Sequence, residues 1–463
     1  MVNIAMEKYR KEMVEDLKKL IAIESTKGEA KPNMPYGKGP FDALMYIIDR
    51  AEELGLSGHN LFGHLAYIDS HEAEEMLAVL THLDVVPAGE GWNTPPFEGV
   101  EKDGRIYGRG AIDNKGPAIA TLYALYAIQE EGIALNKKVR LIFGCDEESG
   151  WGDMEEYKKS QPMPDMAFSP DGSFPIINCE KGTLHIELSK PIENIAMEGI
   201  YLIDFHSGER ANVVPAKASC KIKAKGEALP AMVELFNETS PVQIHVEQKG
   251  GYYELTAIGK SAHGSTPEKG DNALTYLVSF LNTLPIANGD LEQAVFSLGK
   301  YIGNTVFGER LGLDQRDYSG RLTCNVGVFH AQDNQIRIAL DIRYPMCLTR
   351  EDVLTRLQDT FGKDGFAINI LHELPSHFIS EDTFLVQTLK SVYEECTGQD
   401  AYCLAIGGAT YARAFENAVT FGATMPGEEG VEHQPNEYIE IDRLVELSQI
   451  LVNAIVRLCN DPQ

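Results

Sequence analysis

The stretch VRLIFGCDEESG, residues 139–150, joins a largely apolar run to two adjacent acidic residues. Its first half, Val139–Gly144, has the composition of a buried strand, and Glu147 and Glu148 follow closely. A strand end holds a carboxylate rigidly. Two neighbouring carboxylates repel each other unless a cation or a shared proton lies nearby. We therefore interpret the pair as one metal ligand and one proton carrier at the end of a sheet strand.

Alternating strands and helices surround this stretch. Strands are predicted at 64–68, 76–81 and 166–169, with a helix at 118–131 between them. Such alternation indicates an α/β fold with a mainly parallel sheet covered on both faces. In such sheets the chemistry lies on loops at the carboxyl ends of the strands. The chain starts with an amphipathic helix whose apolar side comprises Met6, Tyr9, Met13, Leu17, Leu20 and Ile21.

The pattern changes after residue 181. Strands are predicted at 182–189, 243–247, 252–259, 323–329 and 335–344, with a helix at 273–284. In the last strand apolar residues alternate with Arg337, Ala339, Asp341 and Arg343, which indicates an antiparallel sheet with a polar face beside a cleft. The α/β pattern returns near residue 381, with helices at 384–396 and 441–458. We therefore predict one α/β domain from 1–181 and 381–463, interrupted by an α+β domain at 182–380.

Composition excludes several classes of partner. The 463 residues carry a net charge of −28, which argues against binding to nucleic acid or to an anionic membrane surface. No apolar run reaches the roughly 18 residues of a membrane span. The N-terminal region lacks the apolar core of a signal peptide, so we expect a cytoplasmic protein. The eight cysteines include no Cys-x-x-Cys pair, which favours reduced thiols over a thiolate zinc site.

Five short segments place acids or histidines after predicted strands or before predicted helices. They contain His82 with Asp84, Asp113, Glu147 with Glu148, Asp171, and His433. Taken singly, Asp113 is an N-cap and Asp171 a turn residue. The glycines before Asp113 match neither a dinucleotide-binding fingerprint nor a P-loop. Together the residues form a mixed nitrogen and oxygen ligand set that suits two zinc ions, with manganese and cobalt as alternatives.

Two such ions that share a carboxylate can hold a hydroxide and polarise a carbonyl. Alternation along an extended segment also puts His82 and Asp84 on the same side. The Asp84 carboxylate is therefore expected to accept the second ring N–H of His82, a usual arrangement behind a metal ligand.

These segments resemble the M20 metallopeptidases, and specifically the PepV-like bacterial dipeptidases. The motifs are THLDVVPAG (81–89), GRGAIDNKGP (108–117), DEESG (146–150), SPDG (169–172), SAHGSTP (261–267), GGATYAR (407–413) and HQPNE (433–437). They follow the order of the family across nearly the whole chain. Two positions depart from its usual pattern: Asn114 stands where many relatives have aspartate, and Ala409 stands where a third glycine is common.

The resemblance implies a di-zinc catalytic domain and an inserted lid domain. His82 and Asp171 would hold one zinc ion, and Glu148 and His433 would hold the other. Asp113 would bridge the two ions.

The same resemblance implies roles in the reaction. Glu147 would be the general base, and Asp84 would orient His82. On the lid, His263 would stabilise the oxyanion. Asn212 and Arg343 would bind the terminal carboxylate of the substrate, where the main chain at Gly408 also meets it.

The implied activity is hydrolysis of dipeptides with a free amine, including β-alanyl dipeptides such as carnosine. The long lid suggests a monomer whose partners are small peptides. One alternative is an M20 deacylase or desuccinylase of N-acyl amino acids, which would use the same metals and base. Another is an inactive metal- or peptide-binding protein, against which the intact Glu147 and His263 argue. A purely structural zinc site fits poorly because such sites favour cysteine.

Overall fold

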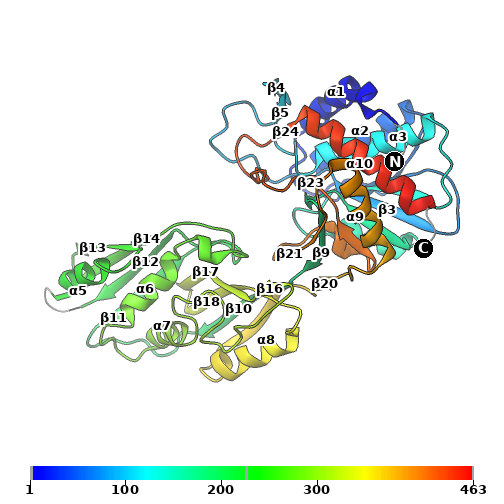
Figure 1. The fold of residues 1–463 in the computed structure, drawn as a ribbon. Helices are drawn as coiled ribbons and strands as arrows, with labels where there is room; N and C mark the ends of the chain where they lie inside the picture. Colours follow the sequence, from blue (N-terminus) through cyan, green and yellow to red (C-terminus); the bar gives the residue numbers. More distant parts are fainter. Residues whose placement is uncertain (1–3, 225–227, 461–463) are drawn as a thin grey trace. The chain divides into compact units, whose positions relative to one another are not determined.

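The computed structural model describes residues 4–224 and 228–460, and the chain divides into two compact units. The first unit comprises Met1–Cys179, Phe378–Leu404 and Ala409–Gln463, and the second comprises Glu180–His377 and Ala405–Gly408. Both ends of the chain, blue and red in Figure 1, therefore belong to the first unit. The domain bounds expected from the sequence stay a prediction. Within the described ranges, no helix is both long and apolar enough to cross a bilayer.

The sheet of the first unit is parallel at its centre and antiparallel at its flanks. It runs through β1 (Ser57–Leu61), β2 (Leu65–Asp69), β6 (Lys138–Gly144), β3 (Met76–His82), β7 (Met166–Ser169), β22 (Ala418–Thr420) and β9 (Ile176–Glu180). The pairs β6–β3, β3–β7 and β7–β22 are parallel. The pairs β1–β2, β2–β6 and β22–β9 are antiparallel. The α/β class is confirmed, and the parallel part predicted from the sequence is the middle of a mixed sheet.

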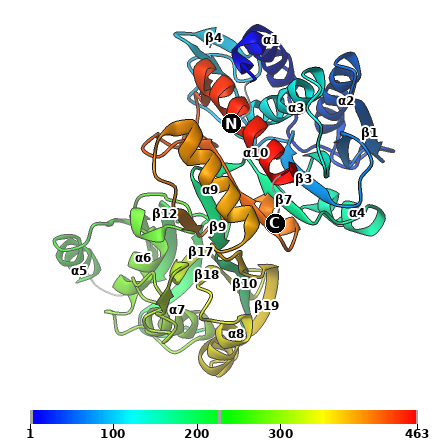
Figure 2. The ribbon, with the colours of Figure 1, turned by 45° about the vertical axis from the view of Figure 1, so that its right-hand side comes forward.

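The two faces of this sheet carry separate cores. Leu77 and Val79 of β3 pack with one set of helices, whereas Ala78 and Leu80 pack on the opposite face with α4 (Gly152–Ser160) and η4 (Tyr411–Ala414). The larger helical layer comprises α1 (Arg10–Ile21), α2 (Lys38–Glu53), α3 (Lys115–Glu130), α9 (Phe384–Thr397) and α10 (Ile441–Asn460). Figure 2 shows α1, α3 and α10 as neighbours in that layer.

The amphipathic segment at the start of the chain is confirmed as η1 (Met6–Tyr9) followed by α1. All six apolar residues predicted on its packed side are buried. Residues 1–3, which the predicted helix also covered, lie outside the described residues.

The three parallel strands β6, β3 and β7 end at the same edge of the sheet. His82 is the last residue of β3 and lies in register with Gly144, the last residue of β6. The loop with Glu147 and Glu148 leaves the sheet at that level, and Asp171 follows β7, the other neighbour of β3. The carboxyl ends of adjacent parallel strands thus gather the acidic segments of the first unit.

The second unit is an eight-stranded antiparallel sheet with helices. The strand order is β13 (Gln243–Lys249), β14 (Tyr252–Ile258), β12 (Lys217–Lys223), β11 (Tyr201–Ser207), β17 (Thr323–Gln332), β18 (Gln335–Tyr344), β10 (Gly182–Pro191) and β19 (Ala367–Leu374). The helices are α5 (Ala228–Asn237), α6 (Ala273–Leu281), α7 (Asp290–Tyr301) and α8 (Arg350–Leu357). Side chains from one face of this sheet enter one core with these helices.

Strand β18 departs from the expected pattern on its polar side. Ile338 and Leu340 are buried with the helices as predicted, but Asp341 and Arg343 on the opposite face are also nearly inaccessible, at 0 % and 6 % exposure. Only Arg337 on that side is exposed. The polar face predicted for the strand is therefore buried along the C-terminal half, because its charges pair with each other.

Candidate functional site

Five acids and histidines of the first unit form two groups that share Asp113. One group is His82, Asp113 and Asp171, and the other is Asp113, Glu148 and His433, with the ligand atoms of each group within 4.8 Å of one another. Asp113 Oδ1 lies 2.9 Å from His82 Nε2, and Asp113 Oδ2 lies 3.0 Å from His433 Nε2. The carboxylate thus presents one oxygen to each group. The structure brings together all five residues predicted as metal ligands, and their binding of metal stays a prediction.

The remaining contacts within the groups have similar lengths. Glu148 Oε1 lies 3.0 Å from His433 Nε2, and Asp171 Oδ1 lies 3.6 Å from His82 Nε2. Each group therefore combines an imidazole nitrogen with carboxylate oxygens.

The ring of His82 is held in one orientation by the main chain. Its Nδ1 lies 2.9 Å from the carbonyl oxygen of Asp84. A carbonyl oxygen only accepts, so Nδ1 donates and carries the proton of the neutral ring. With a cation bound to the ligand group, the neutral ring would present the lone pair of Nε2 to it, as a metal-binding histidine requires.

The carboxylate of Asp84 has a different contact from the one expected. The sequence predicts that it accepts the ring N–H of His82, but its nearer oxygen is 3.6 Å from Nδ1. Its two oxygens instead accept the main-chain N–H groups of Glu147 at 3.2 Å and Glu148 at 3.1 Å. Asp84 therefore links the end of β3 to the loop after β6, with its carbonyl on one side and its carboxylate on the other.

Asn114 supports Asp171 in a way that the sequence did not suggest. Its side chain is fully buried, and Nδ2 donates to the Asp171 carboxylate at 2.9 Å and to the carbonyl of Pro170 at 3.0 Å. An ionised aspartate at position 114 could not donate either bond. The sequence showed Asn114 as a departure from the usual family residue, but it did not indicate which group its side chain would bond.

Arg109 and Glu437 form a second support of the ligand groups, which the sequence also did not suggest. They are a buried ion pair with Nη1 of Arg109 2.6 Å from Oε2 of Glu437. Glu437 accepts the N–H groups of Gly110, Ile112 and Asp113 at 3.0, 3.0 and 3.1 Å.

The guanidinium of Arg109 makes the reciprocal contacts. It donates to the carbonyl oxygens of His433 at 3.2 Å and Gln434 at 3.4 Å. Each member of the pair therefore holds the main chain of the loop that carries the other. These are the loops of Asp113 and His433, two of the three residues of one ligand group. We call this arrangement the Arg109–Glu437 clamp.

The loop of Glu147 is fixed from its other side. The ring N–H of Trp151 donates to the carbonyl of Glu147 at 2.9 Å. The carboxylate of Asp153 accepts the N–H groups of Cys145 at 2.7 Å and Asp146 at 3.0 Å, together with the hydroxyl of Tyr411. Few degrees of freedom remain in the main chain that carries the two glutamates.

The pKa shifts indicate an excess of negative charge. Burial raises the pKa of Glu147 well above its usual value, and the nearby acids add to this. Burial and the charge of Asp113 raise the pKa of Glu148 to about 7. Burial lowers the pKa of His433, but its bonds to Asp113 and Glu148 outweigh this and raise it to about 11.

Divalent cations would relieve such an excess and release the protons that otherwise balance it. The donors are imidazole and carboxylate, with no thiolate among the described ligand groups. This donor set fits zinc, manganese or cobalt.

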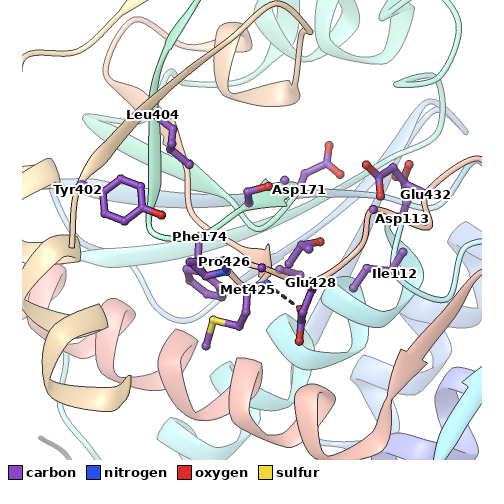
Figure 3. Close-up of a pocket in the computed structure, with 16 residues that line it drawn as sticks. Ile112, Asp113, Asp171, Phe174, Tyr402, Leu404, Met425, Pro426, Glu428 and Glu432 are labelled. Atoms are coloured by element: carbon purple, nitrogen blue, oxygen red, sulfur yellow. Dashed lines mark hydrogen bonds between the residues drawn. The ribbon is translucent and has the colours of Figure 1, made fainter. Parts of the chain in front are cut away.

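A cavity of about 510 Å³ adjoins the ligand groups, with Asp113 and Asp171 in its wall. Figure 3 shows Tyr402 and Leu404 on the side away from Asp113 and Ile112, with Phe174 and Met425 between them. The sixteen residues drawn in its wall include four acids and no lysine, arginine or histidine.

The residues predicted to bind substrate come together in the second unit. The carbonyl of Asn212 accepts the N–H of Gly264 at 2.7 Å, and residues 213 and 263 form a β-bridge. A Cβ atom on Gly264 would lie 2.6 Å from an oxygen of Asp341, which places this segment against strand β18. Arg343 reaches the carbonyl of Gly407 at 3.1 Å, beside Gly408.

The guanidinium of Arg343 is already hydrogen-bonded to other side chains of the protein. Its guanidinium makes a two-point contact with Asp341 at 2.7 and 3.1 Å and donates to the hydroxyl of Thr183 at 3.0 Å. Its charge is therefore balanced inside the protein. The proposed contact with a substrate carboxylate stays a prediction.

His263 has a defined tautomer. Its Nδ1 accepts the N–H of Ser265 at 3.2 Å and lies 2.7 Å from the Ser265 hydroxyl. In the neutral ring the proton is therefore on Nε2.

Comparisons with known proteins agree over nearly the whole chain. Residues 78–457 match the model of "Peptidase family M20/M25/M40". A Bacillus subtilis (strain 168) protein named "Putative dipeptidase YtjP" is 36 % identical over 471 residues, covering 99 % of this chain and 100 % of its own. A Staphylococcus aureus (strain bovine RF122 / ET3-1) protein named "Putative dipeptidase SAB1611c" is 34 % identical over 462 residues, covering 98 % of each chain.

Solved structures with lower identity share the fold. The di-peptidase Dug1p from Saccharomyces cerevisiae has a TM-score of 0.61 at 14 % identity, covering 99 % of this chain and 98 % of its own. Human carnosine dipeptidase 1 has a TM-score of 0.58 at 16 % identity, covering 98 % of this chain and 97 % of its own.

Proposed function

The chain belongs to peptidase family M20/M25/M40, and from this membership we propose that it is a metal-dependent dipeptidase acting on dipeptides with a free amine. The observation that carries the proposal is the pair of ligand groups joined by Asp113, with Glu147 on the adjoining loop. Relatives that cover the whole chain are named dipeptidases, which supports the same reaction. We further propose the PepV-like subtype and a monomeric enzyme.

We assign the ligands as two sets around Asp113. His82 and Asp171 would hold one ion, and Glu148 and His433 the other. When bound, two such ions activate a water molecule and polarise a carbonyl.

Glu147 is the proposed general base. It takes the proton from the attacking water and later delivers it to the leaving nitrogen. The upward shift of its pKa by burial supports both steps, because a carboxyl group with a raised pKa holds a proton more readily than an exposed one. The bond that its N–H donates to Asp84 and the bond that its carbonyl accepts from Trp151 keep its main chain in place during the transfer.

His263 is the proposed donor to the oxyanion of the tetrahedral intermediate. The bond from Ser265 to Nδ1 supports this, because it leaves the proton of the neutral ring on Nε2. Asn212, Arg343 and the main chain at Gly408 are proposed to bind the terminal carboxylate of the substrate. Their proximity within the second unit supports a shared role.

The charge of the cavity favours a free amine over an acyl group such as succinyl. Four acids and no basic residue lie in its wall among the residues that Figure 3 draws. These lining residues offer no side-chain cation to bind a succinyl carboxylate, whereas the exposed carboxylate of Glu432 attracts an ammonium group. β-Alanyl dipeptides carry the same ammonium and are included in the proposed substrates. The alternative remains a deacylase of uncharged N-acyl amino acids.

Hydrolysis of a matched substrate panel tests the proposal. The zinc-loaded protein would be given free-amine dipeptides, the same dipeptides N-acetylated, N-succinyl amino acids, and carnosine. We expect cleavage of the free-amine compounds only, and its loss with chelator. Cleavage of only the acylated compounds would assign the protein to the deacylases. Two bound metal ions without any cleavage would favour the binding-protein alternative.

A further inference from the structure

The wall of the cavity beside the ligand groups contains apolar side chains as well as the acids that would attract an amine. Its wall contains Phe174 and Met425, both largely buried, together with Ile112, Leu404 and Tyr402. Its volume of about 510 Å³ lies within the range of small-molecule sites, roughly 300–1,000 Å³. A side chain could therefore be buried there against apolar surface.

The acids in the wall are distributed unevenly. Asp113 and Asp171 belong to the ligand groups. Glu428 is already neutralised, since it accepts from Arg443 at 2.6 Å and from the N–H of Met425 at 2.8 Å, the bond drawn in Figure 3. Glu432 is exposed at the opposite side from Tyr402 and Leu404. The part of the cavity around Phe174, Met425, Tyr402 and Leu404 is thus lined by apolar side chains, with the neutralised Glu428 beside Met425 and the other acids toward the ligand groups.

We propose that this apolar part binds the side chain of the N-terminal residue of the substrate, and that it selects large uncharged side chains over small or acidic ones. The inference rests on the proposed dipeptidase function. In that function the scissile carbonyl lies at the ligand groups, and the cavity that holds Asp113 and Asp171 also holds the exposed carboxylate of Glu432, which suits the free amine. The N-terminal residue is then the part of the substrate that adjoins Asp113 and Asp171, where this cavity opens.

The proposal sets an order among substrates. Removing a few methylene groups from a side chain in an apolar pocket costs about 10-fold or more in kcat/KM. Leu-Ala, Met-Ala and Phe-Ala should therefore exceed Gly-Ala by about that factor. β-Alanyl dipeptides leave the cavity unfilled and should be slower than Leu-Ala. Asp-Ala should be slowest because its carboxylate would lose its water against the apolar side chains of the cavity.

Two variants test the wall itself. Tyr402→Ala removes a half-exposed ring and should lower kcat/KM for Phe-Ala and Leu-Ala by about 5- to 10-fold, with Gly-Ala unchanged. Leu404→Lys places a cation in the wall. It should raise the ratio of kcat/KM for Glu-Ala to that for Leu-Ala by at least about 10-fold. Phe62→Ala, an exposed residue outside the cavity, is the matched control and should leave every ratio unchanged.

The outcomes separate this proposal from the one on which it rests. If no dipeptide is cleaved, the dipeptidase assignment itself has failed. If Gly-Ala, Leu-Ala and Asp-Ala are cleaved with similar kcat/KM, the assignment stands and the pocket proposal is overturned. A series with fixed N-terminal alanine (Ala-Gly, Ala-Leu, Ala-Phe) tests the opposite orientation of the dipeptide in the site. Selectivity confined to that series would place the C-terminal side chain in the cavity instead.

Discussion

Glu147 and Glu148 are neighbours in the sequence, yet their surroundings give them different proposed tasks. Glu148 contacts His433 within a ligand group, whereas Glu147 is not a member of either group. Burial raises the pKa of both carboxyl groups. The Asp84 carboxylate receives both of their main-chain N–H groups, so one acid fixes the direction of two others. Hydrogen bonds of this kind to the main chain decide which carboxylate is available for metal and which for a proton.

Replacing Glu147 with alanine tests the assignment of the base. We expect kcat to fall by at least about 10²–10⁴-fold, because no other group takes up the proton from water. The metal content, measured by elemental analysis of the purified protein, should stay at the wild-type value. Glu155→Ala, an exposed acid in the first turn of α4, is the control and should keep its activity. Near-normal turnover of the Glu147 variant would remove this residue from the mechanism.

Replacing Asn114 with aspartate tests the support of Asp171. The new carboxylate cannot donate to Asp171 and repels it, so affinity for the ion at His82 and Asp171 should fall about 10-fold or more. The loss should shrink as pH falls and the added acid takes up a proton. Titration with cobalt, followed by its visible absorption, measures both. Asn93→Asp adds the same charge on an exposed loop and should have no such effect. Unchanged affinity in the Asn114 variant would contradict the role.

The elements of the first unit position these atoms through strand order. The parallel neighbours β6, β3 and β7 end at one edge, which brings His82, the Glu147 loop and Asp171 together. The loops of Asp113 and His433 do not belong to that edge by strand pairing alone. The Arg109–Glu437 clamp ties them to each other through main-chain bonds from both sides. In the second unit, Asp341 and Arg343 of β18 also form a buried ion pair, in which the two charges balance each other.

The clamp should control one ligand group more than the other. Glu437→Gln keeps the shape but leaves the Arg109 charge unbalanced, so the loops of Asp113 and His433 should loosen. We expect the affinity for one of the two metal ions to fall about 10- to 100-fold. Competition with a chelator, followed by cobalt absorption, separates the two sites and does not depend on activity.

The same two segments provide a matched control for the clamp. Arg105 and Glu440 are also an ion pair, with their side chains 37 % and 47 % exposed. Surface pairs contribute little, about 0–1 kcal/mol. Glu440→Gln should therefore leave both metal affinities unchanged. Equal affinities in the Glu437 and Glu440 variants would show that the clamp does not position the ligands.

At the scale of the whole molecule, the acids where the ions are proposed to bind all belong to the first unit. The chain has a net charge of −28, and five acids, Asp84, Asp113, Glu147, Glu148 and Asp171, lie in or beside the ligand groups. Their mutual repulsion opposes folding of the first unit until cations offset it. The second unit has its own sheet and its own core and contains none of these acids.

Removal of metal should therefore destabilise the first unit selectively. Ions present at about 100 times their Kd add about 2.7 kcal/mol per site, which corresponds to a Tm shift of about 5–10 °C for a unit of this size. The two tryptophans, Trp92 and Trp151, both belong to the first unit, so their fluorescence follows its unfolding. We expect chelator to lower the Tm seen by tryptophan, and zinc to restore it.

A variant without the bridging carboxylate is the control for that measurement. Asp113→Asn should unfold at a Tm that chelator hardly changes, because it removes the residue common to both groups. If chelator leaves the tryptophan Tm of the wild-type protein unchanged, the ions do not contribute to the stability of this unit.

The sequence by itself determined the kinds of element and the kinds of ligand. Apolar patterning predicted an amphipathic helix at the start of the chain and strands at 76–81 and 139–144, because such patterns are a local property of the chain. The order of the acidic and histidine motifs indicated the family.

Only the tertiary structure decided which atoms meet. Asp84 uses its carbonyl toward His82 and its carboxylate toward the glutamates. Arg109 and Glu437, separated by 328 positions, share one buried pair. Arg343 is buried because Asp341 on its own strand and Thr183 on the next surround it. Such contacts depend on how distant segments pack and how each buried polar group is satisfied, which no local pattern encodes.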